Sequence, residues 1–84
     1  MTYWVEFGGG AQVQFHSLPE NARDALIERA VDLAERPWDG AVVRPPGDDA
    51  RFRETVFGYG RGLLGVYLDE EAKTIRIFDI VWIG

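Results

Sequence analysis

Apolar residues are concentrated in three stretches near the end of the chain. Residues 51–57 (RFRETVF), 62–68 (GLLGVYL) and 73–83 (KTIRIFDIVWI) are rich in β-branched and aromatic side chains, which is typical of strands. The connections GYGRG and DEEA are short, so these segments are predicted to form an antiparallel meander with tight turns. The segment YWVEF, residues 3–7, has the same character and predicts one more strand.

A helical pattern occupies residues 17–36. Its apolar residues recur every three or four positions and form one stripe: Ala22, Leu26, Ala30, Leu33 and Ala34. Ser17 is followed three residues later by Glu20, which predicts a capping box at the start of the helix. Pro37 is expected to end the helix at about Arg36.

The segment AQVQFH, residues 11–16, fits two structures. Its apolar residues alternate with polar ones, which favours a strand paired with residues 3–7 in a hairpin. However, Ala11, Phe15 and Leu18 also fall on one face of a helix. These residues alone favour the hairpin slightly.

Residues 38–50 (WDGAVVRPPGDDA) carry the turn signals DG and PPG and are predicted to form a loop. The order of elements is then one strand, a helical region and three meandering strands. This order predicts an α/β (α+β) sandwich with helices on one face of the sheet. The chain has 84 residues, 46% of them apolar, so we expect a single domain covering residues 1–84.

The composition narrows the classes of function. The chain has no cysteine, no signal-peptide pattern and no stretch near the roughly 20 apolar residues that span a membrane. We therefore expect a cytoplasmic protein with no membrane partner. The net charge of −5 argues against a general nucleic-acid binder. Eight of the nine basic residues are arginine, however, so a local phosphate-binding patch stays open.

Candidate chemistry centres on arginine. Arg51 and Arg53 should share one face of their strand, with Glu54 on the other. Two guanidinium groups roughly 7 Å apart can hold an RNA backbone or stabilise a charged transition state, or they can simply pair with acids. Tyr67 either stacks on a base or donates a proton, or it is a buried structural residue. Arg61 is expected to be exposed in the GYGRG turn, which lacks the Lys-Ser/Thr of a phosphate-binding loop.

The sequence offers little for a metal or a cofactor. The single histidine, His16, has no Cys, Ser or second His in a catalytic pattern, so we expect it at the surface. Asp48 and Asp49 are adjacent, but no further ligands accompany them at metal-binding spacing. We therefore expect no metal and no cofactor.

The pattern FRE…FG.GRG.L.VYLDEEAKTIRIFDIV resembles the RelE/ParE superfamily of toxins from bacterial type II toxin–antitoxin systems, along nearly the whole chain. The pair Phe52–Arg53 matches the start of the family's second strand, and Val66–Tyr67 matches the end of its third. Residues 69–81 match its acidic turn and fourth strand. The resemblance implies a RelE-like β-α-α-β-β-β order, an antiparallel meander sheet with helices packed on one face, and a short first helix at residues 9–16.

The resemblance also implies a function, partners and a site. The expected function is a toxin that inhibits translation by ribosome-dependent mRNA cleavage, as an endoribonuclease (mRNA interferase). Its partners would be a cognate antitoxin and mRNA on the ribosome, with a homodimer as an alternative when the antitoxin is absent. The expected catalytic residues are Arg53, Arg61, Glu54 and Tyr67, and the expected RNA-binding residues are Arg51, Arg44 and Arg76.

Two departures from the family pattern keep other functions open. Leu64 stands where family nucleases usually carry an arginine shortly before the third-strand Tyr. The sequence ends at Gly84, where the family's basic pair and catalytic tail would begin. The alternatives are a ParE-like toxin that acts by binding DNA gyrase, and a catalytically inactive protein that binds an antitoxin and autoregulates its operon.

Overall fold

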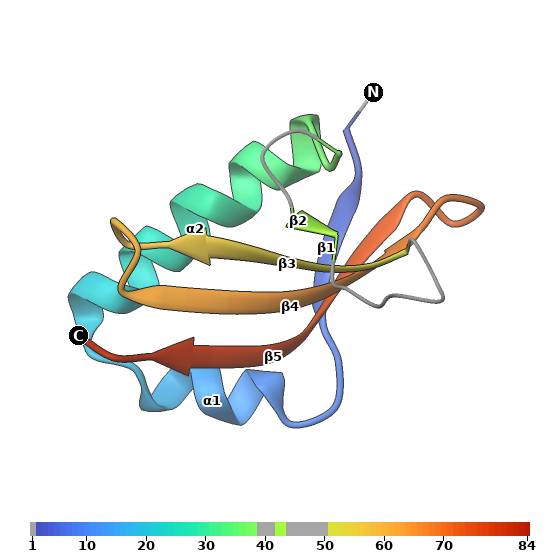
Figure 1. Cartoon of the computed structure of the whole chain (residues 1–84). Helices are drawn as coiled ribbons and strands as arrows, with labels where there is room; N and C mark the ends of the chain where they lie inside the picture. Colours follow the sequence, from blue (N-terminus) through green and yellow to red (C-terminus); the bar gives the residue numbers. More distant parts are fainter. Residues whose placement is uncertain (1, 39–41, 44–50) are drawn as a thin grey trace.

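The computed structural model of the chain describes residues 2–38, 42–43 and 51–84 (Figure 1). Its elements follow in the order β1 (Trp4–Phe7), α1 (Ala11–Ser17), α2 (Glu20–Glu35), β2 (Val42–Val43), β3 (Phe52–Phe57), β4 (Gly62–Asp69) and β5 (Thr74–Trp82). The α+β class and the predicted order of the main elements are confirmed. No helix in the described part of the chain is long and apolar enough to cross a membrane.

The strands form one five-stranded sheet in the order β1-β5-β4-β3-β2. The predicted meander is confirmed, because β3 pairs antiparallel with β4 and β4 pairs antiparallel with β5. The sheet as a whole is mixed rather than antiparallel, since β1 pairs in parallel with β5. The helices intervene between β1 and the later strands, so β1 can join the far edge of the meander.

The short strand β2 lies within the segment predicted to be a loop. Val42 and Val43 pair antiparallel with Glu54 and Arg53 of β3. The loop prediction is therefore wrong at these two residues. A two-residue strand is too short to leave a periodic pattern in the sequence.

The structure corrects the hairpin prediction and the capping box. Residues 11–17 are helical, as the family resemblance implied. Ser17 is the last residue of α1, and its hydroxyl donates a hydrogen bond to the Val13 carbonyl at 3.0 Å, so it is not available to α2. Instead α2 begins at Glu20 with Pro19 as its N-cap and no side-chain cap. The predicted end is confirmed, because Arg36 is the C-cap.

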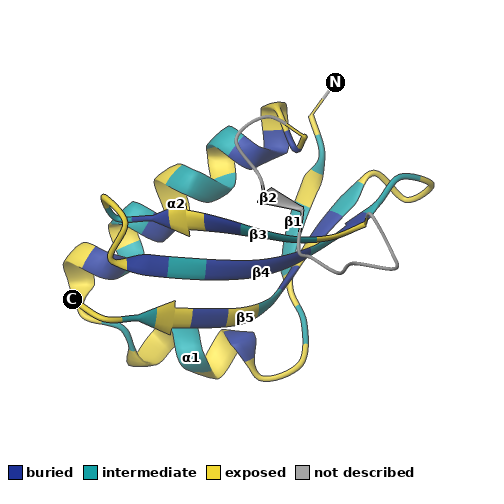
Figure 2. Ribbon diagram, in the orientation of Figure 1, coloured by how far each residue is buried: buried dark blue, intermediate teal, exposed yellow. Residues whose placement is uncertain are grey.

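The helices cover one face of the sheet, and the core lies between the two layers (Figures 1 and 2). The hydrophobic core cluster consists of buried side chains from α1, α2, β3, β4 and β5: Ala11, Leu26, Leu33, Phe57, Leu64, Val66, Leu68, Ile75, Ile77 and Ile80. Alternation along β4 sends its even-numbered residues into this core, so its odd-numbered residues face away from the helices.

A β-bulge interrupts the pairing of β4 and β5. Gly65 pairs with Asp79, but its neighbour Val66 pairs with Ile77, so Phe78 is an extra residue. The bulge explains how both Ile77 and Ile80 reach the core although they are an odd number of residues apart. It also directs Phe78 to the open face of the sheet.

Candidate functional site

The sheet face away from the helices carries a shallow hollow of about 420 Å³. We call it the aromatic hollow, and its lining residues are Phe52, Tyr67, Asp69, Arg76 and Phe78. The Phe52 ring is the centre of the cluster. Its centroid lies 4.8 Å from that of Tyr67 and 5.8 Å from that of Phe78, both in edge-on geometry. Neighbouring strands therefore bring three aromatic rings to one surface.

Gly65 makes room for this cluster. A Cβ atom at this position would lie 3.0 Å from the Phe78 ring and 3.3 Å from the Asp79 Cβ. The absence of a side chain therefore leaves space for the Phe78 ring next to the β4 backbone. The glycine and the bulge together fix where the third ring of the aromatic hollow stands.

Charged groups border the rings. The Arg76 guanidinium donates hydrogen bonds to Glu6 Oε1, at 2.9 Å from Nη2 and 3.2 Å from Nε. Arg51 places its guanidinium carbon 5.3 Å from the Tyr67 ring centroid. The Asp69 carboxylate accepts a hydrogen bond from the Ala72 N–H at 3.1 Å, which holds it in place at the turn. The hollow thus combines surfaces for stacking with two arginines at its border, one of them paired with Glu6, and the Asp69 carboxylate.

The predicted catalytic residues do not meet at one place. Arg53 pairs with Val66, a core residue, so its side chain leaves β3 on the helix side. Glu54 and Tyr67 leave the sheet on the opposite side. Arg61 is exposed in the β3–β4 turn, five residues before Val66 and roughly 16 Å from it along the strand. Only Glu54 and Tyr67 of the four therefore share a face.

The predicted RNA-binding residues are also divided. Arg76 and Arg51 border the aromatic hollow, whereas Arg44 lies outside the described residues. The guanidinium groups of Arg51 and Arg53 do not form a pair on one face: Arg51 contacts Tyr67, and Arg53 contacts Trp38. The reason is that β3 begins only at Phe52, so strict alternation does not extend to Arg51.

Sequence reasoning missed three members of the hollow. Phe52 could have been predicted, because alternation along β3 puts it on the same face as Glu54. Asp69 ends β4 on the face of Tyr67, and alternation predicts this too. Phe78 owes its orientation to the bulge, for which the sequence has no clear signal. His16 is exposed, as predicted.

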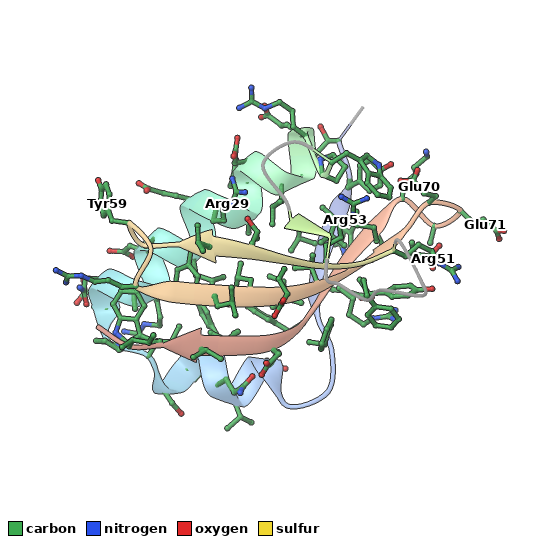
Figure 3. The ribbon with its side chains drawn as sticks, in the orientation of Figure 1. Arg29, Arg51, Arg53, Tyr59, Glu70 and Glu71 are labelled. Atoms are coloured by element: carbon green, nitrogen blue, oxygen red, sulfur yellow. The ribbon has the colours of Figure 1, made fainter. Side chains whose placement is uncertain are left out.

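A second polar cluster lies at the β4–β5 turn (Figure 3). The Glu70 carboxylate accepts hydrogen bonds from the Tyr3 hydroxyl at 2.7 Å and the Trp38 indole N–H at 2.8 Å. The Tyr3 hydrogen bond is the main cause that holds the pKa of Glu70 below its ordinary value. The same bond raises the pKa of Tyr3, because the neutral hydroxyl is the donor. Both Glu70 oxygens are engaged, which marks this cluster as structural.

No group of three acidic, histidine or cysteine side chains in residues 2–38 and 51–84 is arranged to hold a metal ion. The side chains of the aromatic hollow can supply stacking, charge stabilisation by arginine and proton transfer by a carboxylate or a phenol.

Solved structures share this fold over almost the whole chain. A chain of the toxin–antitoxin complex RelBE2 from Mycobacterium tuberculosis is 24% identical with a TM-score of 0.81, and the match covers 98% of this chain and 99% of that one. The isolated RelE toxin of E. coli is 14% identical with a TM-score of 0.81, covering 98% and 85%. A chain of the RelE–RelB complex of Pyrococcus horikoshii is 18% identical with a TM-score of 0.75, covering 100% and 98%.

The sequence itself matches no family model and no curated relative. The similarity to known proteins is thus one of fold, and it extends over both helices and the whole meander. The chain has the fold of the RelE toxins.

Proposed function

We propose that this chain is the toxin of a type II toxin–antitoxin pair and that it inhibits translation by cleaving mRNA on the ribosome. The full-length similarity to RelE and to RelE–RelB complexes supports the toxin assignment. The observation that carries the nuclease assignment is the aromatic hollow, which places stacking surfaces, arginine and a carboxylate on one open face.

The proposed reaction is attack of a ribose 2′-oxygen on the adjacent phosphorus. Bases of single-stranded mRNA stack on the Phe52 and Phe78 rings. The Asp69 carboxylate takes the proton of the 2′-hydroxyl, and the Tyr67 hydroxyl gives a proton to the departing 5′-oxygen. Arg76 stabilises the negative charge that grows on the phosphoryl oxygens. The products are a 2′,3′-cyclic phosphate and a free 5′-hydroxyl.

The proposed antitoxin site is an apolar groove of about 390 Å³ between α2 and β1. We call it the α2–β1 groove, and residues that line it include Val5, Phe7, Phe15, Ile27, Val31 and Ile77. β1 is an edge strand of the sheet formed by the described residues, so its outer side can accept an added strand. An amphipathic antitoxin segment laid along this edge would bury the groove and extend the sheet.

A second function is favoured by the charge around the hollow. Arg76 is already paired with Glu6, and the protein carries a net charge of −5. Both features weaken attraction for RNA. A toxin that acts only by binding a protein target such as DNA gyrase, or an inactive member that only binds its antitoxin, needs no free cation at this place.

One experiment separates these functions. The chain is expressed in bacteria with and without a candidate antitoxin, and growth, new mRNA ends by primer extension and plasmid supercoiling are measured together. Growth arrest with new RNA ends that disappear in Asp69→Asn supports the nuclease. Growth arrest with relaxed plasmid DNA and intact RNA supports gyrase binding instead. Unimpaired growth at verified soluble expression contradicts both toxin mechanisms.

A further inference from the structure

The β3–β4 turn holds a large aromatic side chain entirely in solvent. Tyr59 is fully exposed, with a relative accessibility of 107% (Figure 3). Its backbone is left-handed with φ of 59°, and the flanking Gly58 and Gly60 have φ of 62° and 85°. A bulky residue rarely adopts this conformation, and glycine adopts it freely. The turn therefore carries a tyrosine that folding does not require and that its backbone disfavours.

Beneath this tyrosine lies a hollow of about 370 Å³, which we call the turn hollow. Its lining residues come from the turn, α2 and the end of β5: Asn21, Ala25, Gly58, Tyr59, Arg61 and Trp82. It lies at the other end of the sheet from the aromatic hollow, because Arg61 and Tyr67 are separated by roughly 20 Å along β4. The turn hollow is thus a distinct place on the molecule.

The indole of Trp82 is fixed as a wall of this hollow. The Phe57 ring stacks on it with centroids 5.6 Å apart and an interplanar angle of 27°. Gly58 approaches so closely that a Cβ atom there would lie 2.7 Å from the Trp82 ring. The turn hollow therefore has one rigid aromatic wall and one exposed aromatic residue at its rim.

The polar groups of the turn hollow suit a nucleotide. The Arg61 guanidinium has no ion pair or hydrogen bond with any side chain among residues 2–38 and 51–84, whereas Arg76 is paired with Glu6. The Arg61 backbone is held by its bonds to Gly58 and Ile83 at 3.2 Å and 2.9 Å. The exposed amide of Asn21 can donate to and accept from the edge of a base. None of the residues that line this hollow is acidic.

We propose that the turn hollow binds one nucleotide of a single-stranded RNA. The base stacks against Tyr59 at the mouth of the hollow, next to the Trp82 wall, and the phosphate binds Arg61. The turn hollow would be a second RNA-binding place besides the aromatic hollow. Only the choice of RNA as its ligand rests on the proposed function. Binding here requires no cleavage, and it supplies affinity that the neutralised Arg76 does not.

The test is binding of a fluorescein-labelled, 2′-O-methylated RNA hexanucleotide, which cannot be cleaved through its 2′-oxygen. Affinity is measured by fluorescence anisotropy for the wild type, Tyr59→Gly and Arg61→Gln. Loss of one stacked base corresponds to a weakening of about tenfold or more. Tyr59→Gly should weaken binding by this factor while its thermal unfolding midpoint stays equal or rises, because glycine suits the left-handed turn. If Tyr59 had only a structural role, Tyr59→Gly would not lose RNA affinity while its thermal unfolding midpoint stayed equal or rose.

Arg23→Gln is the matched control for charge. Arg23 lies on α2, two residues from both Asn21 and Ala25 and therefore on another face of the helix. Equal losses in Arg23→Gln and Arg61→Gln, or unchanged affinity in both Tyr59→Gly and Arg61→Gln, would overturn the proposal. Binding of the hexanucleotide at the turn hollow together with intact cellular mRNA would refute the nuclease function and leave this inference standing.

Discussion

The guanidinium carbon of Arg53 lies 4.2 Å from the ring centroid of Trp38. This contact joins β3 to the residues that follow α2. Trp38 in turn donates its indole N–H to Glu70, which also accepts the Tyr3 hydroxyl. Arg53 is therefore connected to a structural cluster on the helix side of the sheet, although its sequence context suggested catalysis.

We expect Arg53→Ala to lower stability more than activity. Loss of a partly exposed cation–π contact should reduce the free energy of unfolding by about 1 kcal/mol. Urea denaturation measures this change, and Arg53→Lys should recover part of it. New mRNA ends should persist in Arg53→Ala at equal soluble expression. A folded Arg53→Ala protein without ribonuclease activity would return this arginine to the catalytic residues.

Release of Arg76 from Glu6 should strengthen RNA binding. Glu6→Gln removes the carboxylate that pairs with the Arg76 guanidinium at 2.9 Å. The affinity for 2′-O-methylated RNA should rise, with a steeper dependence on salt concentration. Arg76→Ala should instead reduce the cleavage rate by about 10²–10³-fold, the usual cost of losing one charge-stabilising donor. Equal affinities for wild type and Glu6→Gln would show that Arg76 does not face the RNA.

Gly65→Ala tests whether the aromatic hollow needs the space that Gly65 leaves for Phe78. The added methyl group would meet the Phe78 ring at 3.0 Å, so the ring must move. We expect the free energy of unfolding to fall by about 1–3 kcal/mol, as for overpacked sites. Gly10→Ala is the control, because a Cβ there has no neighbour within 4 Å. Denaturant curves for the two variants decide the matter, and similar midpoints would contradict the expected clash.

Stability should depend on pH through Glu70. Its folded-state pKa is lowered, chiefly by the Tyr3 hydrogen bond, so its contribution is fully present above the ordinary carboxyl pKa of about 4.3. The contribution is lost as the pH falls through the lowered folded-state value. The thermal midpoint of the wild type should therefore drop more steeply below about pH 4.3 than that of Glu70→Gln. Glu71→Gln, changed at an exposed position of the same turn, should follow the wild type.

A charge in the α2–β1 groove should prevent antitoxin binding. Ile27 is 50% exposed and lines this groove, so Ile27→Glu should fold normally and lose affinity for the antitoxin by at least tenfold. Val13→Glu is matched to it, since Val13 is 71% exposed on α1 and does not line the groove. Co-purification and calorimetry compare the two variants. Equal binding would place the antitoxin elsewhere.

Local patterns were sufficient for most of the fold. Alternation and tight turns located β3, β4 and β5, and the apolar stripe located α2. Pairing between distant segments was not visible in this way. The parallel addition of β1 to β5 and the bulge at Phe78 arise from tertiary packing, which leaves no short-range period in the sequence.

The candidate site, like the fold, could be predicted only as far as local patterns determine it. Alternation along β3 put Glu54 on the opposite face from Arg53, as the structure has it, although both residues were assigned to one catalytic set. Arg53 and Arg61 were grouped by residue type, although the length of β4 separates them. Residue type alone could not reveal that Trp38 and Glu6 already engage two of the arginines.

The parallel pair of β1 and β5 has a consequence for the order of events during synthesis. Glu6 and its partner Arg76 are 70 residues apart, so β1 leaves the ribosome long before its partner strand is made. The aromatic hollow needs Phe78, and the α2–β1 groove needs Ile77. We expect both surfaces to form together, in the last step of folding, because such distant contacts close late. On the proposed function, an unfinished copy of this chain would have neither the surface for RNA cleavage nor the groove for the antitoxin.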